Sequence, residues 1–335
     1  MKSCTKALVI GGTGFIGSRI VDDLLAKGFS VRVTVRKKRP AAFEDAQKCG
    51  PVEFVYGDVL DPDSIRECVK GVDLVFACFG LLGKWGIPDR AYRQTNVQGV
   101  INVLEATPEG GIGQFIHLSS AGVLGPLAGG VVADESFPLR PSNIYETTKS
   151  EAEEEVHRCA VRRAIPFTII RPEFVYGPGD MHVLGLFKAI ARKRFLLIGS
   201  GASLLHPTYI DDLVGGIALC TGNEKALGQT FLITGKEPVS VKNLALAIAD
   251  ELEVALPNVR IPIHVARLMA AFFEAAARLN ACSDPILTRA RVKFFTENRA
   301  FTAEKARRQL GYLPQVDFRE GVRRTVCWYR NQGHL

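Results

Sequence analysis

The sequence predicts an α/β protein: a doubly wound parallel sheet of the Rossmann type, joined to a smaller, mostly helical substrate domain. Three observations support this prediction. Short β-branched runs alternate with helical patterns through the first half of the chain, a glycine-rich turn follows the first run directly, and the rhythm changes after Arg171-Pro172. Alternating strands and helices indicate a parallel sheet, because parallel strands need crossover connections and helices commonly provide them.

The expected strands are short apolar runs bounded by turn residues. In the first half they cover residues 7–10, 31–35, 52–56, 74–77, 115–118 and 167–170. Helical patterns lie between them, over residues 15–27, 64–70, 95–106 and 144–164. Further on we expect a strand over 195–198, a helix over 212–220 and a strand over 231–234 that can return to the main sheet.

These elements divide the chain into two domains. Residues 1–175 are assigned to the sheet domain, with 206–235 returning to it, and residues 176–205 and 236–335 to the substrate domain. The second domain is expected over the carboxyl ends of the strands, where ligands of open α/β sheets bind.

The composition is that of a globular protein. Of 335 residues 47% are apolar and 23% are charged, which is too apolar for a disordered chain. No run approaches the roughly 18 apolar residues that a membrane span needs. No secretory signal is visible either, so we expect a cytoplasmic protein. The amphipathic segment 262–281 is expected to pack against the second domain, with peripheral membrane attachment as the alternative.

The cysteines, histidines and basic residues carry no metal or nucleic-acid pattern. Cys68 and Cys78, the closest pair of eight cysteines, are ten positions apart, and the six histidines include no HExxH. We expect no metal and free thiols in a reducing compartment. The net charge of +7 comes from clusters spread along the chain without interleaved aromatic residues, so we expect no nucleic-acid partner.

The glycine-rich turn predicts a dinucleotide site. It ends the first strand and opens the first helix, where one glycine makes the tight turn, one lets a pyrophosphate approach and one permits close helix–strand packing. The helix N-terminus adds unpaired N–H groups. The residues expected to contact the cofactor here are Gly11, Thr13, Gly14, Phe15, Ile16 and Gly17.

The end of the second strand favours NADP over NAD. A site selective for NAD usually places an acid there for the ribose 2′-hydroxyl, whereas the sequence has Arg36 and Lys37, and a guanidinium can bind a phosphate bidentately. The alternative is that Arg36 is a surface residue and both cofactors are tolerated. Asp58, after the third strand, is expected to accept from the adenine amino group, and helix capping is left to Asp61 or Asp63.

Hydroxyl groups and one amine form the expected catalytic set. Tyr145 and Lys149 are four apart in a helical segment and therefore share a face. A phenol has a pKa near 10, so proton exchange near neutrality requires a lower value, which a neighbouring ammonium favours. Ser119 and Ser120 end the fifth strand and can hold a substrate oxygen beside Tyr145.

Together these residues resemble the extended short-chain dehydrogenase/reductase family, also known as the NAD-dependent epimerase/dehydratase family. The resemblance covers nearly the whole chain. Its motifs, in order, are the glycine turn, Gly57-Asp58-Val59, Asn96-Val97-x-Gly99, Ser119-Ser120-Ala121-Gly122, Tyr145-x-x-x-Lys149, Arg171-Pro172, Val175-Tyr176-Gly177-Pro178-Gly179-Asp180 and Tyr209-Ile210-Asp211-Asp212.

The resemblance implies roles for individual residues. Ser120, Tyr145 and Lys149 are the implied catalytic residues, and Tyr145 and Lys149 are also cofactor contacts. The other implied cofactor contacts are Val59, Ala77, Ser119 and Pro172. The resemblance also suggests a homodimer formed by helix 95–106 and the Tyr145 helix.

The expected reaction is hydride transfer between nicotinamide and a secondary alcohol or ketone. Segments 81–87, 124–132 and 181–187 are largely apolar, and with Leu205 they suggest a hydrophobic substrate like those of 3β-hydroxysteroid dehydrogenases and dihydroflavonol reductases. Leu124 stands where many members have Tyr, and Leu205 lies near the position of an Arg that contacts the substrate diphosphate in many nucleotide-sugar members. The main alternative is a nucleotide-sugar 4-epimerase or dehydratase, and a minor one is a non-catalytic dinucleotide-sensing scaffold.

Overall fold

A seven-stranded sheet forms the centre of the protein. The computed structural model describes residues 5–36, 52–83, 85–280 and 285–335. The sheet has the order β11-β6-β5-β4-β1-β2-β3, and every neighbouring pair is parallel. Its strands are β1 (Lys6–Ile10), β2 (Ser30–Val35), β3 (Val52–Tyr56), β4 (Leu74–Ala77), β5 (Gln114–Leu118), β6 (Phe167–Pro172) and β11 (Gln229–Ile233). The predicted fold class is confirmed.

The central strands form where apolar runs are covered on both faces. In β1 the side chains of Ala7, Leu8 and Val9 are all fully buried. The late strand β11 pairs with β6, Phe231 lying opposite Ile170, so the second half of the chain does return to the sheet. The order reverses between β1 and β4, which is where open α/β sheets bind their ligands.

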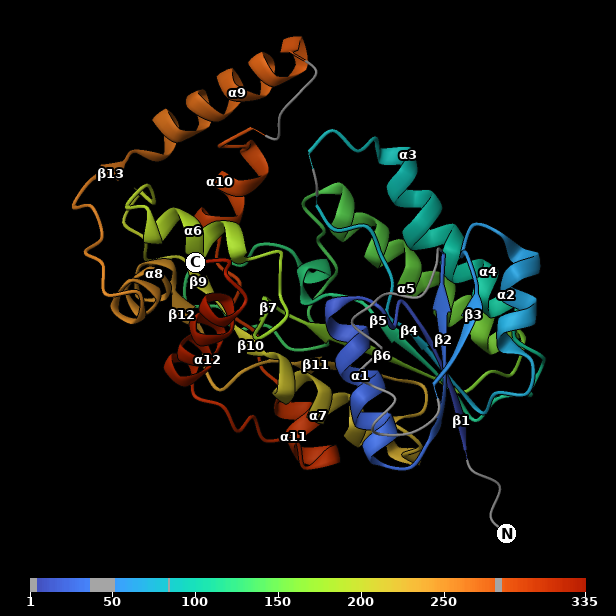
Figure 1. The fold of residues 1–335 in the computed structure, drawn as a ribbon. Helices are drawn as coiled ribbons and strands as arrows, with labels where there is room; N and C mark the ends of the chain where they lie inside the picture. The colour runs from blue at the N-terminus through green and yellow to red at the C-terminus, as the bar shows by residue number, and fades with distance from the viewer. Residues whose placement is uncertain (1–4, 37–51, 84, 281–284) are drawn as a thin grey trace.

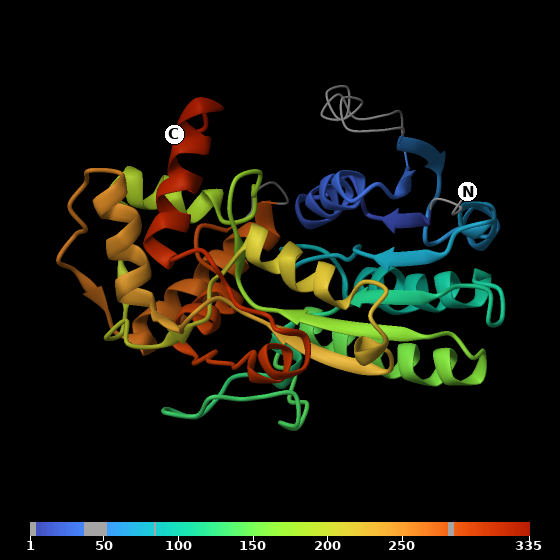
Figure 2. The same cartoon turned by 90° about the horizontal axis from the view of Figure 1, so that it is seen from below.

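Helices cover both faces of the sheet (Figure 2). The α1 helix (Phe15–Ala26) and α7 (Ile210–Cys220) share one core with Val9 and Val33. The opposite face carries α2 (Pro62–Val69), α4 (Gly99–Ala106) and α5 (Ile144–Arg162), which pack in a second core with Leu8. Asp61 caps α2 by accepting from the amides of Asp63 and Ser64, as expected. The predicted helices are present with ends shifted by at most two residues, apart from the one that leads into α4.

The helix that leads into α4 begins earlier than its sequence pattern indicates. It starts with α3 (Asp89–Tyr92), and a π-helical stretch, η3 (Arg93–Gln98), joins α3 to α4. Within η3 the side chain of Asn96 bonds to the backbone of Leu81, with its Oδ1 2.7 Å from the amide nitrogen. A π-helical turn is an insertion that sequence periodicity does not reveal, and such turns are frequent at functional sites.

The remaining elements gather at one side of the sheet (Figure 1). Short paired strands tie them together: β7 (Val175–Tyr176) with β10 (Thr208–Tyr209), β9 (Leu204–Leu205) with β12 (Val239–Ser240), and β8 (Leu197–Ile198) with β13 (Arg260–Ile261). The strand expected over 195–198 is thus limited to two residues. The helices are α6 (Leu184–Ala191), α8 (Val241–Glu251), α9 (Ile263–Asn280), α10 (Arg289–Thr296), α11 (Glu304–Leu310) and α12 (Phe318–Asn331), with 3-10 turns η4 (Ala121–Leu124) and η5 (Glu224–Ala226).

The α9 helix is buried along only one narrow side. Ala266, Ala270 and Glu274 point inward, while Leu268 and Phe272 remain 71% and 70% exposed. We expected segment 262–281 to pack against the second domain. This is correct for the side of α9 that carries Ala266, Ala270 and Glu274, and wrong for the side that carries Leu268 and Phe272. Figure 1 shows α9 as an outlying helix beside α10. No helix in the described part of the chain is long and apolar enough to cross a membrane.

Candidate functional site

The turn between β1 and α1 has the backbone form that a phosphate-binding loop requires. Gly11 has a φ of +83°, and a Cβ there would lie 2.6 Å from the carbonyl oxygen of Cys78. A Cβ on Gly17 would collide with the carbonyl of Gly11, so the helix can pack this closely only with glycine. Gly14 precedes α1 with no side-chain cap, and Thr13 and Gly14 are exposed while Phe15 and Ile16 are half-buried.

The residues expected to recognise the adenosine end lie beyond β2 and β3. Arg36 is exposed directly after β2, whereas Lys37 lies outside the described residues. The carboxylate of Asp58 accepts from the amide of Leu60 at 3.0 Å and is half-buried at the end of β3. Val59 is buried, and its backbone carbonyl accepts from the Asn102 side chain at 2.7 Å.

An orphaned hydroxyl lies at the carboxyl end of β5. Ala77 ends β4 and is fully buried, and Pro172 ends β6. Ser119, directly after β5, is 4% exposed, and its hydroxyl has no hydrogen-bond partner among the described residues. A buried hydroxyl without a partner costs free energy unless a ligand satisfies it. This orphaned hydroxyl and the glycine turn therefore fit a dinucleotide lying across the ends of β1, β4 and β5.

Ser120 and Tyr145 meet at the end of β5. The Ser120 hydroxyl accepts from the amide of Gly122 at 3.1 Å and lies close enough to the Tyr145 phenol to lower its pKa. Tyr145 is in the first turn of α5, which begins after Asn143 because the Asn143 side chain caps it by accepting from the amide of Glu146. This cap fixes the start of α5 and so places Tyr145 in its first turn.

Lys149 is buried one turn further along α5. Its Nζ donates to the carbonyl of Leu118 at 2.7 Å and to that of Phe79 at 3.3 Å, so it bridges the ends of β5 and β4. Burial lowers the pKa of Lys149 to about 8, and the nearby Glu153 carboxylate partly opposes this effect. The amine therefore remains mostly protonated at pH 7.

The pKa of Tyr145 differs from the sequence-based expectation. Burial raises the pKa of Tyr145, and the neighbouring Glu173 carboxylate raises it further. The Ser120 hydroxyl lowers this pKa, but by less than burial raises it. Lys149 is not among the groups that shift the pKa of Tyr145, and its ammonium donates to two backbone carbonyls instead. The expected depression of the phenol pKa by this amine alone is thus wrong for the protein chain by itself.

A buried charge cluster beside Tyr145 was not predicted. Arg299 donates to Glu146 at 2.7 Å, and both side chains are at most 5% exposed. The other Glu146 oxygen accepts from the amide and hydroxyl of Ser142 at 2.7 and 2.9 Å. Glu173, 4% exposed, faces this pair, and burial raises its pKa to about 7, with Arg299 opposing the shift and Glu146 adding to it.

Sequence reasoning missed this cluster because its members are far apart in the chain. Arg299 lies 153 positions after Glu146 and reaches α5 from the segment before α11. The only signal in the sequence is local: Glu173 stands directly after the strand-ending Arg171-Pro172, at a strand end where ligands bind.

Two of the apolar positions expected near the substrate belong to the core. Leu205 is fully buried in the main core, and Leu124 is fully buried with Leu127 and Phe301. Their apolar character is explained by packing, so neither supports the substrate assignment. Leu82 and Met181, in the other two expected lining segments, are 42% and 52% exposed.

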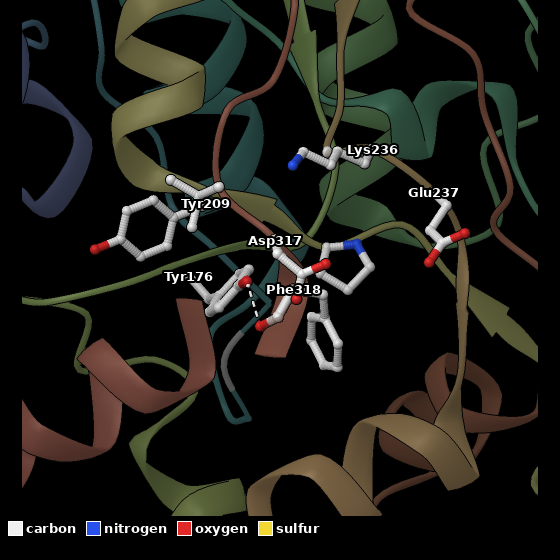
Figure 3. A pocket seen from close by; sticks show the side chains of 9 residues that line it. Tyr176, Tyr209, Lys236, Glu237, Asp317 and Phe318 are labelled. Carbon is white, nitrogen blue, oxygen red and sulfur yellow. Dashed lines mark hydrogen bonds between the residues drawn. The ribbon is translucent and has the colours of Figure 1, made fainter. Parts of the chain in front are cut away.

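A separate pocket lies away from these residues. It is lined by Tyr176, Pro207, Tyr209, Gly235, Lys236, Glu237, Val316, Asp317 and Phe318, and the Tyr176 hydroxyl donates to the carbonyl of Phe318 at 3.2 Å (Figure 3). None of the predicted catalytic or cofactor-binding residues lines this pocket. It therefore adds nothing to the catalytic assignment.

Comparisons with known proteins agree with this arrangement. The sequence profile of the NAD dependent epimerase/dehydratase family matches residues 7–233. The chain is 29% identical to 3beta-hydroxysteroid-dehydrogenase/decarboxylase isoform 1 of Arabidopsis thaliana, over 95% of this chain and 78% of that protein. It is 30% identical to a 2-alkyl-3-oxoalkanoate reductase of Stenotrophomonas maltophilia, over 95% of this chain and 98% of that protein. The crystal structure of a dTDP-glucose 4,6-dehydratase from Streptomyces venezuelae with NAD bound superposes with a TM-score of 0.79 at 25% identity, over 98% of this chain and 97% of that one.

Proposed function

Since the chain belongs to the NAD dependent epimerase/dehydratase family, we propose that it is an NAD(P)-dependent oxidoreductase acting on a secondary alcohol or ketone of a hydrophobic substrate. The observation that carries the proposal is the convergence of Ser120, Tyr145 and Lys149 at the ends of β4 and β5, beside the glycine turn of β1. Relatives named as 3beta-hydroxysteroid dehydrogenase and oxoalkanoate reductase support the substrate class.

The protein's part in the reaction is to align the substrate and move a proton. When bound, the dinucleotide supplies or accepts the hydride. In reduction the Tyr145 phenol donates its proton to the carbonyl oxygen, which Ser120 also hydrogen-bonds. The Lys149 ammonium, buried at the ends of β4 and β5, would hold the cofactor ribose. Ser119 and the glycine turn are the proposed cofactor contacts.

The substitution Tyr145→Phe tests the proposal. It removes the transferable proton but keeps the ring, so we expect kcat with a steroid-like ketone to fall by roughly 10²–10⁴-fold. Dinucleotide affinity, measured by fluorescence titration, should change less than about twofold, because the phenol is not needed to hold the pyrophosphate. Tyr56→Phe, at an exposed tyrosine of β3, is the matched control. Undiminished turnover in Tyr145→Phe would reject the assignment.

A nucleotide-sugar 4-epimerase or dehydratase is the second candidate, favoured by the likeness to the dTDP-glucose 4,6-dehydratase structure. Such an enzyme returns the hydride to a bound intermediate and shows no net cofactor turnover. A dehydratase also requires acidic residues beside Ser120, whereas this chain has Ala121 and Gly122 there. A lasting absorbance change of NADPH with ketones supports the oxidoreductase, whereas UDP-sugar interconversion without such a change supports the alternative.

We further propose that NADP is preferred over NAD, because Arg36 directly follows β2 and is exposed, and its guanidinium suits a 2′-phosphate. The substitution Arg36→Ala should weaken NADP binding by about tenfold or more and leave NAD binding within about twofold. The affinities of the variant and of wild type for both dinucleotides are measured by titration. Arg66→Ala, at an exposed position of α2, is the control. Equal losses for the two cofactors would contradict the proposal.

We also propose the substrate domain, the homodimer surface and the location of the enzyme. Residues 176–205 and 236–335 are the proposed substrate domain. The α4 and α5 helices pack side by side and are the proposed homodimer surface. The thiols of Cys68, Cys78, Cys159 and Cys220 are all free, which supports a reducing compartment such as the cytoplasm.

A further inference from the structure

The outward side of α9 carries a stripe of large apolar side chains that the described chain leaves uncovered. Leu268, Phe272 and Leu279 are 71%, 70% and 86% exposed, and Val265 and Met269 on the same side are 36% and 37% exposed. Spacings of three, four and seven place these five side chains along one side of the helix. We call them the outer stripe.

The opposite side of α9 explains why the helix is held in this position. Ala266 and Ala270 are fully buried, and they pack with Ile198 and Val292 in a small separate core. Glu274 is also buried and accepts from the backbone and side chain of Arg289 at 2.8 and 2.7 Å. At its far end Arg278 lies over the ring of Trp85, 5.5 Å from the centroid, which connects α9 to the loop after β4. The helix is therefore fixed by one side while the outer stripe is presented outward.

The charged residues of the segment that carries the outer stripe are almost all positive. Between residues 254 and 280 the cations are Arg260, Arg267 and Arg278. Glu274 is the only acid in that range, and it is buried and paired with Arg289. An apolar stripe with an excess of arginine suits an anionic surface that also has an apolar layer beneath it.

From the outer stripe and this charge excess we infer that α9 docks the protein onto the interface of an anionic lipid bilayer. Leu268, Phe272 and Leu279 enter the boundary between headgroups and acyl chains, and the arginines remain at headgroup level. A second copy of the chain is less well matched to this surface. Stable protein interfaces take roughly 20 residues from each partner, whereas the outer stripe has five, on a helix that Figure 1 shows standing apart.

Vesicle sedimentation with the full-length protein tests the inference. We expect wild type to sediment with vesicles of phosphatidylserine and phosphatidylcholine, and much less with phosphatidylcholine alone. The double variant Leu268→Ser/Phe272→Ser should bind the anionic vesicles at least about tenfold more weakly. Because both side chains are exposed, its thermal unfolding should match that of wild type. Val161→Ser, at a 75% exposed valine of α5, is the control and should bind like wild type.

Three outcomes would overturn the inference. Wild type can fail to bind the anionic vesicles, or the double variant can bind them as well as wild type does. Light scattering can also show a wild-type dimer that becomes monomeric in the double variant while neither binds lipid, which would identify the occupant as a second copy. None of these measurements depends on catalysis, so the result stands apart from the proposed reaction.

Discussion

At the scale of single residues, the least expected feature is the carboxyl group of Glu173. It is buried beside Tyr145, and burial raises its pKa to about 7. Around Tyr145 the facing charges are Glu173 and Glu146, with Arg299 behind them and Lys149 on the next turn of α5. When Glu173 ionises, its negative charge disfavours the phenolate and so raises the pKa of Tyr145.

The substitution Glu173→Gln should therefore shift the pH dependence of the reaction. Oxidation of an alcohol needs the phenolate, so its kcat rises with pH as Tyr145 loses its proton. A neutral side chain at 173 removes the repulsion and should move this rise to lower pH by about one unit. The measurement is kcat for alcohol oxidation between pH 6 and pH 10. An unchanged profile with normal stability would mean that Glu173 does not act on the phenol.

At the scale of elements, α5 joins the proposed catalytic residues Tyr145 and Lys149 to a buried ion pair. Glu153 lies one turn after Lys149 and accepts from Arg171 of β6 at 2.9 and 2.5 Å. Both side chains are at most 7% exposed. The pair holds α5 against the strand whose end supplies Pro172 and Glu173.

The substitution Glu153→Gln should destabilise the fold by about 3 kcal/mol, because it leaves the Arg171 guanidinium buried without a counter-charge. Urea unfolding gives the free energy, and Glu154→Gln, at an exposed position of the same helix, should change it by less than about 0.5 kcal/mol. A loss at Glu153 no larger than that of the control would show that the ion pair does not hold α5 in place.

At the scale of the whole molecule, local patterns predicted most of the sheet domain. The runs over 52–56 and 74–77 are strands with the predicted ends, and Gly11, expected in the tight turn, has a left-handed φ there. These features depend on neighbours in the chain: β-branched residues form buried strands, and only glycine tolerates that backbone and the close approach of α1. The residues of the catalytic set were predicted for the same reason, since each sits at a strand end or on one turn of α5.

The charges around the proposed catalytic residues and the exposure of the outer stripe of α9 depend on contacts between distant segments. Arg299 meets Glu146 across 153 positions, and no periodicity within either segment encodes that meeting. The amphipathic pattern of 262–281 is equally compatible with burial and with exposure, and only the packing of Ala266 and Ala270 against the small core shows which side faces outward. A one-dimensional pattern records which side chains share a face, whereas the folded chain decides what that face meets.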